Sequence, residues 1–236
     1  MEIMQLNHFT FNNSSTSDFG LLVTGKRIFS APGRKVEKYS VPGRDGDILV
    51  ELGGYDNIII QYEIAIIDDF KVNASAIKNW LLSSKGYQRL TDTYDTAHYR
   101  EGCIYSGIDY ITTALNREGR ATIEFDCKPQ RFLLSGETAQ TFNRSGTITN
   151  PTLMASKPLV RAYGKGTVVI NGTSIHITDD DQYVDINSES QQAYEGNINR
   201  NNDIEVDEFP VLDSGENTIT LTGINRVEIT PRWWEL

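Results

Sequence analysis

The chain has 236 residues, of which 39% are hydrophobic and 10% aromatic, and its 22 basic and 32 acidic side chains give a net charge of −10. This composition belongs to a globular protein and argues against a disordered or fibrous chain, and the length favours two domains. Because a net negative charge repels polyanions, nucleic acid binding is not expected.

The sequence carries no recognisable targeting or membrane-spanning signal. Residues 1–11 lack the basic start and apolar centre of a signal peptide, and the longest aliphatic run, residues 64–67, is far below the roughly 20 residues that span a bilayer. We therefore expect synthesis in the cytoplasm without a signal peptide, and no membrane association. Cys103 and Cys127 are too few for a disulfide framework and are expected to be small buried thiols.

The charge is unevenly distributed along the chain. Residues 1–133 carry a net charge of −2, whereas residues 134–236 carry −8. A change of this size, at a segment (134–138) that interrupts the periodic pattern, predicts a domain boundary after Leu133. The alternative is a single domain with one acidic face running through it.

The first half is expected to consist mostly of strands. Residues 57–67 are rich in β-branched and aromatic side chains and alternate polar with apolar positions from Gln61 onwards. Residues 120–127 alternate more clearly, since every second side chain from Ala121 to Cys127 is apolar. Both segments are typical of half-buried strands.

One helix is expected in this half, over about residues 73–86. Asn73 is a suitable N-cap, and Gly86 is suited to end the helix in the left-handed conformation. One face collects the apolar side chains of Ala74, Ile77, Trp80 and Leu81. An aromatic residue at this spacing usually belongs to a core, so Trp80 is assigned to packing.

The second half repeats turn residues at short intervals and shows no good helix. Its strongest local prediction is a hairpin in which strands 167–170 and 174–177 flank Asn171-Gly172, a pair that supplies the two positive φ angles of a type I′ turn. Further short strands are expected at 183–186, 217–221 and 226–230. Evenly spaced short strands predict a β-sandwich.

Motifs that suggest chemistry lack the context they need. Asp18-Phe19-Gly20 matches the metal-binding tripeptide of kinases, but no glycine-rich loop or catalytic loop accompanies it. Residues 199–203 resemble the start of a calcium loop, yet Ile204 replaces the required glycine and Pro210 the required glutamate. Asp179-Asp180-Asp181 is interpreted as a solvated turn, with a cation as the alternative.

The remaining candidates for a chemical site are equally unsupported by spacing. His8, His98 and His176 show no zinc-binding pattern, and no nucleophile motif is present. The sequence therefore predicts no catalytic, cofactor-binding or metal-binding residues, and no cofactor.

A compact turn is one candidate for an interface. Pro42 fixes one backbone angle, Gly43 permits a positive φ, and Arg44 follows between flanking strands at 36–39 and 48–52. The segment predicts a strand–loop–strand tip, which either contacts a neighbouring subunit or is a plain hairpin end.

The chain end is the other candidate for an interface. Trp233 and Trp234 lie in the last four residues, where a chain usually frays unless it is held down. Two tryptophans there predict that the end docks, either onto its own domain or onto a partner.

Several of these segments occur in an order that matches one protein family. They are residues 17–21, 41–46, the helix with Ile77 and Trp80-Leu81, 125–129, 170–172, 184–186, 209–212, 214–219 and 231–234. In this order, over nearly the whole chain, the sequence resembles the distal tail proteins of long, non-contractile-tailed bacteriophages and prophages.

The resemblance implies a mainly β fold with two domains. Residues 1–133 would form a β-rich domain with one helix that assembles into a homohexameric ring, and residues 134–236 a galectin-like β-sandwich. The implied partners are the tail tube protein, the tail-associated fibre or lysin protein, and receptor-binding proteins. The implied location is the distal end of the tail in the virion, and the implied role is structural, without enzymatic activity.

The charge division fits such a ring. A nearly neutral first half assembles without strong self-repulsion, whereas six copies of the second half would gather about −48 charges if they lay at the centre. Two other classes of function stay open. One is a carbohydrate-binding β-sandwich using Tyr163, His176 and Tyr194, and the other is a hydrolase of host polymers.

Overall fold

A computed structural model describes residues 7–25, 30–66, 69–109, 111–113, 118–179 and 182–236. The chain divides into two compact units, residues 1–131 and 132–235, close to the position where the charge changes. Strands dominate both units, and the one α-helix of the described residues lies in the first. The predicted fold class, mainly β with one helix and a β-sandwich, is confirmed.

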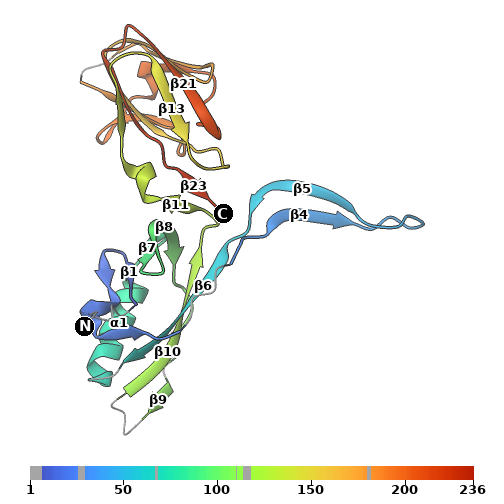
Figure 1. Cartoon of the computed structure of the whole chain (residues 1–236), viewed down its shortest axis with the longest axis vertical. Coiled ribbons are helices and arrows are strands. Elements are labelled where there is room, and N and C mark those ends of the chain that lie inside the picture. The colour runs from blue at the N-terminus through green and yellow to red at the C-terminus, as the bar shows by residue number, and fades with distance from the viewer. Residues whose placement is uncertain (1–6, 26–29, 67–68, 110, 114–117, 180–181) are drawn as a thin grey trace, which may run out of the picture. The chain divides into compact units, whose positions relative to one another are not determined.

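The first unit is built on one antiparallel sheet with the strand order β2-β1-β7-β8-β10-β6-β3, to which β9 adds beside β10 (Figure 1). Its elements are β1 (Phe9–Phe11), β2 (Ser14–Ser15), a 3-10 helix (Thr16–Phe19), β3 (Leu21–Val23), β4 (Arg34–Tyr39), β5 (Ile48–Tyr55), β6 (Ile58–Ile66), α1 (Phe70–Ser83), β7 (Gln88–Asp92), β8 (Asp95–Cys103), β9 (Ile111–Thr113) and β10 (Glu118–Cys127).

The predicted strands at 57–67 and 120–127 are neighbours in this sheet, and Ile67 lies outside the described residues. β6 and β10 pair from Ile58 opposite Cys127 to Ile66 opposite Gly119. Alternation decides which side chains face the core, and Ile123 and Phe125 are fully buried. Neither cysteine is in a disulfide, and Cys127 is buried as expected, whereas Cys103 is only half-buried.

The predicted helix exists, but its bounds differ from the expected 73–86. The backbone N–H of Asn73 donates to the Asp69 carbonyl at 3.0 Å, so Asn73 already lies inside the helix, and Asp69 is the N-cap. Gly86 has the expected positive φ of 67° but lies beyond the C-cap, Ser84. The apolar face is confirmed, because Ala74, Ile77 and Leu81 are buried and Trp80 packs against the same core.

Two antiparallel sheets, ordered β12-β22-β14-β17-β18-β19 and β13-β21-β15-β16-β20, form most of the second unit, and β11 and β23 pair with each other outside these two sheets. Its elements are β11 (Arg131–Leu133), a 3-10 helix (Leu134–Glu137), β12 (Gln140–Phe142), β13 (Gly146–Asn150), β14 (Leu159–Tyr163), β15 (Gly166–Ile170), β16 (Thr173–Ile177), β17 (Val184–Asn187), β18 (Gln192–Glu195), β19 (Ile198–Asn199), a 3-10 helix (Asn201–Asp203), β20 (Ile204–Val206), β21 (Gly215–Thr222), β22 (Arg226–Thr230) and β23 (Trp234–Glu235).

Inward side chains from both sheets form one core, which makes this unit a sandwich. Val160 and Ile186 enter the core from the first sheet, and Val168 and Ile175 from the second. The predicted hairpin is confirmed, because β15 pairs with β16 around Asn171-Gly172, whose φ angles are 50° and 88°.

Candidate assembly surfaces

The hairpin of β4 and β5 forms a two-stranded ribbon of its own, here called the arm (residues 34–55) (Figure 1). Large apolar side chains are exposed along it, with Leu49 at 61% and Leu52 at 56%, and the others are Tyr39, Val41, Ile48 and Val50. An isolated two-stranded hairpin is at best marginally stable in water, and a contiguous exposed apolar surface usually marks an interaction site. The arm therefore has the properties of a segment that docks on a partner.

The tip of the arm is the predicted turn around Pro42, Gly43 and Arg44. The backbone N–H of Arg44 donates to the Val41 carbonyl at 3.1 Å, and Gly43 and Gly46 have φ angles of 81° and 79°. Neither glycine has another atom within 4 Å of where a Cβ would lie. The tip is exposed, and its role as an interface stays a prediction.

The chain end docks on its own unit, which is one of the two outcomes expected. Trp233 is 3% exposed and belongs to the core of the second unit, and Ser156 donates its hydroxyl to the Pro231 carbonyl at 2.7 Å. The half-buried Trp234 donates its indole N–H to the Ala155 carbonyl at 2.8 Å. A further contact of Trp233 or Trp234 with a partner stays a prediction.

A polar and aromatic surface, which was not expected from the sequence, lies on the first unit. We call it the Tyr105 cluster (Asn57, Tyr87, Tyr105, Asp126 and Lys128). Tyr105 donates its hydroxyl to Asp126 at 3.1 Å, and the Asn57 amide donates to the other oxygen of that carboxylate at 2.8 Å and to the Tyr87 hydroxyl at 2.6 Å. Lys128 lies 5.1 Å from the centre of the Tyr87 ring.

The cluster combines an exposed tyrosine and a carboxylate, Asp126, with a cation, Lys128, beside the Tyr87 ring. Tyr105 is 74% exposed, and the hydrogen bond to Asp126 together with the charge of that carboxylate raises the pKa of Tyr105. The residues of the Tyr105 cluster come from separate strands and loops, so no local sequence pattern predicts the cluster.

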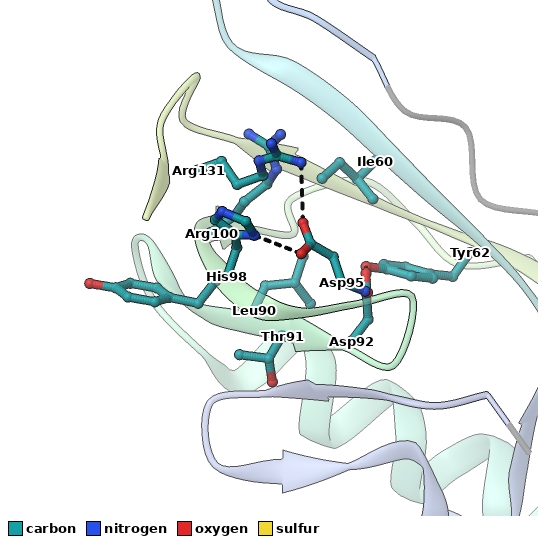
Figure 2. A pocket seen from close by; sticks show the side chains of 10 residues that line it. Ile60, Tyr62, Leu90, Thr91, Asp92, Asp95, His98, Arg100 and Arg131 are labelled. Carbon is teal, nitrogen blue, oxygen red and sulfur yellow. Dashed lines mark hydrogen bonds and ion pairs between the residues drawn. The ribbon is translucent and has the colours of Figure 1, made fainter. Parts of the chain in front are cut away.

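Polar side chains also line a small cavity in the first unit. Figure 2 shows Asp95 between His98 and Arg131, whose nitrogens lie 2.7 Å and 3.3 Å from its two carboxylate oxygens. Nearby, Tyr62 donates its hydroxyl to Asp92. The cavity has a volume of about 10 Å³, which is room for about one water molecule. These side chains therefore link neighbouring strands, and the cavity has no room for a substrate.

The kinase-like tripeptide has a structural explanation. Ser15 and Asp18 form a reciprocal capping box at the 3-10 helix of residues 16–19. The Phe19 ring stacks on Trp80 with 4.6 Å between centroids, and Gly20 ends the turn with a φ of 63°. The three residues fix a turn against α1.

The calcium-like loop also uses its oxygens within the chain. Asn201 accepts the Ala193 N–H at 2.6 Å through its side-chain oxygen, and Asp203 pairs with Arg200 at 3.2 Å. Asp179 pairs with Lys165 at 2.8 Å, while Asp180 and Asp181 lie outside the described residues. Within the described part of the chain, no group of three His, Cys, Asp or Glu side chains is placed to hold a metal ion.

The carbohydrate-binding alternative is not favoured. Tyr163 and Tyr194 lie on β14 and β18 of one sheet, whereas His176 lies on β16 of the other. Arg226 covers the Tyr163 ring at 4.0 Å, and His176 lies 3.1 Å from the Thr167 hydroxyl. The three side chains do not converge on one site.

In the described ranges, none of the helices is both long and apolar enough to cross a membrane. No protein-family model and no curated protein matches the sequence.

Solved structures resemble the chain over nearly its whole length. One is the crystal structure of the SPP1 Dit protein, a paradigm of the hub adsorption apparatus in phages that infect Gram-positive bacteria. It has 12% sequence identity, a TM-score of 0.75, and coverage of 98% of this chain and 100% of that one. Others are the phage P2 baseplate in its activated conformation with Ca and with Sr, each at 11% identity and a TM-score of 0.55, covering 95% of this chain and 97% of that chain. At these identities the likeness concerns the fold, and the chain has the fold of the SPP1 Dit protein.

Proposed function

We propose that this chain is a structural subunit of a bacteriophage tail tip, in which six copies form a ring at the distal end of the tail. In this role the ring joins the tail tube protein to the tail-associated fibre or lysin protein and anchors receptor-binding proteins. The observation that carries the proposal is the full-length likeness to the SPP1 Dit protein, which covers both units and not one common β-sandwich alone. The role requires no catalytic group and no cofactor.

The arm supports assembly of the first unit with itself. Its exposed apolar residues, with Leu49 and Leu52 among them, have no cover within the described part of the chain. Full burial of such side chains stabilises by about 1.5–3 kcal/mol each, so covering the arm is favourable, and we propose a second copy as the cover. A contact between two different patches of one chain generates a closed ring when the rotation closes.

The charge division supports the placement of the two units within the ring. The first half carries only −2, whereas residues 134–236 carry −8, so crowding the second halves at the centre would cost electrostatic energy. We propose residues 1–133 as the ring-forming domain and residues 134–236 as the outer domain.

The solution mass tests the ring. One chain has a mass of 26.5 kDa, so light scattering should give about 159 kDa for a hexamer. Replacing Leu49 and Leu52 together with Asp should lower the mass towards that of one chain. Leu153→Asp is the matched control, because Leu153 is 92% exposed in the second unit and should leave the mass unchanged. A wild-type chain that stays monomeric at every concentration would count against an autonomous ring.

Electron microscopy of virions of a phage that encodes the protein tests its location. Gold-labelled antibodies against the chain should bind at the distal end of the tail. Labelling along the tube or on the capsid would contradict the proposed role.

A further inference from the structure

An arrangement of tyrosine, carboxylate and arginine occurs twice in the second unit. Arg226 lies 4.0 Å from the Tyr163 ring centre and 3.3 Å from the Glu228 carboxylate, which also accepts the Tyr163 hydroxyl at 3.4 Å. The second example is Arg161 with Tyr183 at 4.2 Å and Asp185 at 2.7 Å. A planar guanidinium stacks on a ring and donates to a carboxylate at the same time.

The Tyr105 cluster has the first two members of this arrangement. Tyr105 donates its hydroxyl to Asp126 at 3.1 Å, as Tyr163 does to Glu228, and its ring is largely exposed. Within the described residues, no arginine, lysine or histidine pairs with Asp126 or lies over the Tyr105 ring. Asn57 holds the second carboxylate oxygen at 2.8 Å and so fixes the orientation of Asp126.

The arm tip carries the missing type of group. The side chain of Arg44 is exposed and makes no hydrogen bond or ion pair with any other described residue. Its glycine neighbours leave open space around the backbone, so another surface can approach the tip closely. An arginine always carries its charge in proteins, and the loop holds it at the far end of an apolar hairpin.

We propose that Arg44 of one copy docks on the Tyr105 cluster of a second copy, where its guanidinium stacks on Tyr105 and donates to Asp126. This inference rests on the proposed ring and names the acceptor surface for the arm tip. Arg44 and Asp126 belong to different patches of the chain, so their contact is heterologous, as a closed ring requires. Asp45 and Asp47 also lie at the tip and Lys128 lies in the cluster, so the attraction is local to Arg44 and Asp126. Every copy carries both halves of this pair, so a second copy can supply the acceptor.

Reversal of each charge tests the contact. Arg44→Glu or Asp126→Arg should weaken subunit association roughly thirtyfold or more, measured by light scattering over a dilution series. Tyr105→Ala removes the stacking surface at an exposed position and should weaken association without affecting folding, which circular dichroism checks. Lys38→Glu is the matched control, because Lys38 is an exposed cation on the same arm and should have little effect.

Mixing the two charge variants shows whether the contact runs between copies. In an alternating ring, the glutamate introduced at position 44 of one variant would meet the arginine introduced at position 126 of the other, and the unchanged Arg44 would meet the unchanged Asp126. Every contact would then join opposite charges, so equimolar Arg44→Glu and Asp126→Arg chains should recover the wild-type mass. If the contact lay within one chain, mixing would restore nothing. The inference would be overturned if Arg44→Glu associated as strongly as the wild type. It would also be overturned if association of Arg44→Glu were restored only by reversing the charge of an acidic residue within 134–236. Either result would leave the proposed ring intact.

A crosslinking experiment covers the case in which the wild-type chain does not associate strongly. With p-benzoylphenylalanine in place of Tyr105 and an isotope-labelled second copy at high concentration, crosslinks should form to residues 41–46 of the labelled copy. Crosslinks only to other segments, or none, would overturn the inference. If the chain stayed monomeric and still gave these crosslinks, the result would count only against a ring that forms without other tail proteins, and the inference would stand.

Discussion

Asp185 shows how single residues support the sandwich. Asp185 is only 3% exposed, and Arg161 donates to both of its carboxylate oxygens, at 2.7 Å and 2.8 Å. The hydrogen bond to Asp185 raises the pKa of Arg161, so the guanidinium keeps its charge. The register places Arg161 directly opposite Asp185, which ties β14 to β17 across the outer face of the sheet.

Removing the Asp185 charge should destabilise the second unit. Asp185→Asn keeps the shape but leaves Arg161 without its counter-charge, and because the guanidinium is partly solvated we expect a loss of about 1–3 kcal/mol in the free energy of unfolding. Urea denaturation measures it. Glu189→Gln breaks the exposed pair with Lys157 and should cost less than about 1 kcal/mol, so equal effects of the two substitutions would contradict the argument.

Cys103 offers a chemical test of the Tyr105 cluster. Partial burial and the charge of Asp126 raise the pKa of the Cys103 thiol, which lowers the thiolate fraction that reacts with alkylating reagents. Asp126→Asn removes the negative charge, so the pKa should fall and alkylation by iodoacetamide at pH 8 should become faster. Asp45→Asn removes a charge from the arm tip and is the control. An unchanged rate in Asp126→Asn would show that Asp126 does not act on this thiol.

At the scale of elements, the strands and the hairpin follow from alternation and turn residues, both of which are local. The start of α1 could not be predicted from local sequence. Its N-cap is Asp69, which has a φ of 46° and makes no side-chain capping hydrogen bond, whereas Asn73 resembles a cap only in its residue type. The Tyr105 cluster also could not be predicted from the sequence, because hydrogen bonds such as that from Asn57 to Asp126 join segments far apart in the chain. The arm's strands and tip were expected, whereas the exposure of its side chains, which no other described residue covers, is a tertiary property.

The 3-10 helix at residues 134–137 is held by the chain end, and one glycine makes that approach possible. A Cβ on Gly136 would lie 2.4 Å from the backbone nitrogen of Trp233, and Arg232 donates its N–H to the Gly136 carbonyl at 2.8 Å. Gly136→Ala should therefore push the chain end away and cost about 1–3 kcal/mol.

The tryptophans report on that displacement. Fluorescence of Gly136→Ala should shift to longer wavelength, because Trp233 gains water contact, and the urea midpoint should fall. Gly107→Ala is the matched control, since a Cβ there meets nothing within 4 Å. A wild-type spectrum and midpoint in Gly136→Ala would show that the chain end is not closely packed there.

At the scale of the whole molecule, two separate cores predict separate unfolding. Ile77 lies in the core of the first unit and Ile186 in that of the second, and each is fully buried. Truncating a buried isoleucine to alanine costs about 2–5 kcal/mol, and the cost stays within the cooperative unit that contains it. Calorimetry of the full chain should show two transitions, of which Ile77→Ala lowers one and Ile186→Ala the other. If both variants shifted a single transition by similar amounts, the two units would unfold as one, and the acidic half would not be an independent outer domain.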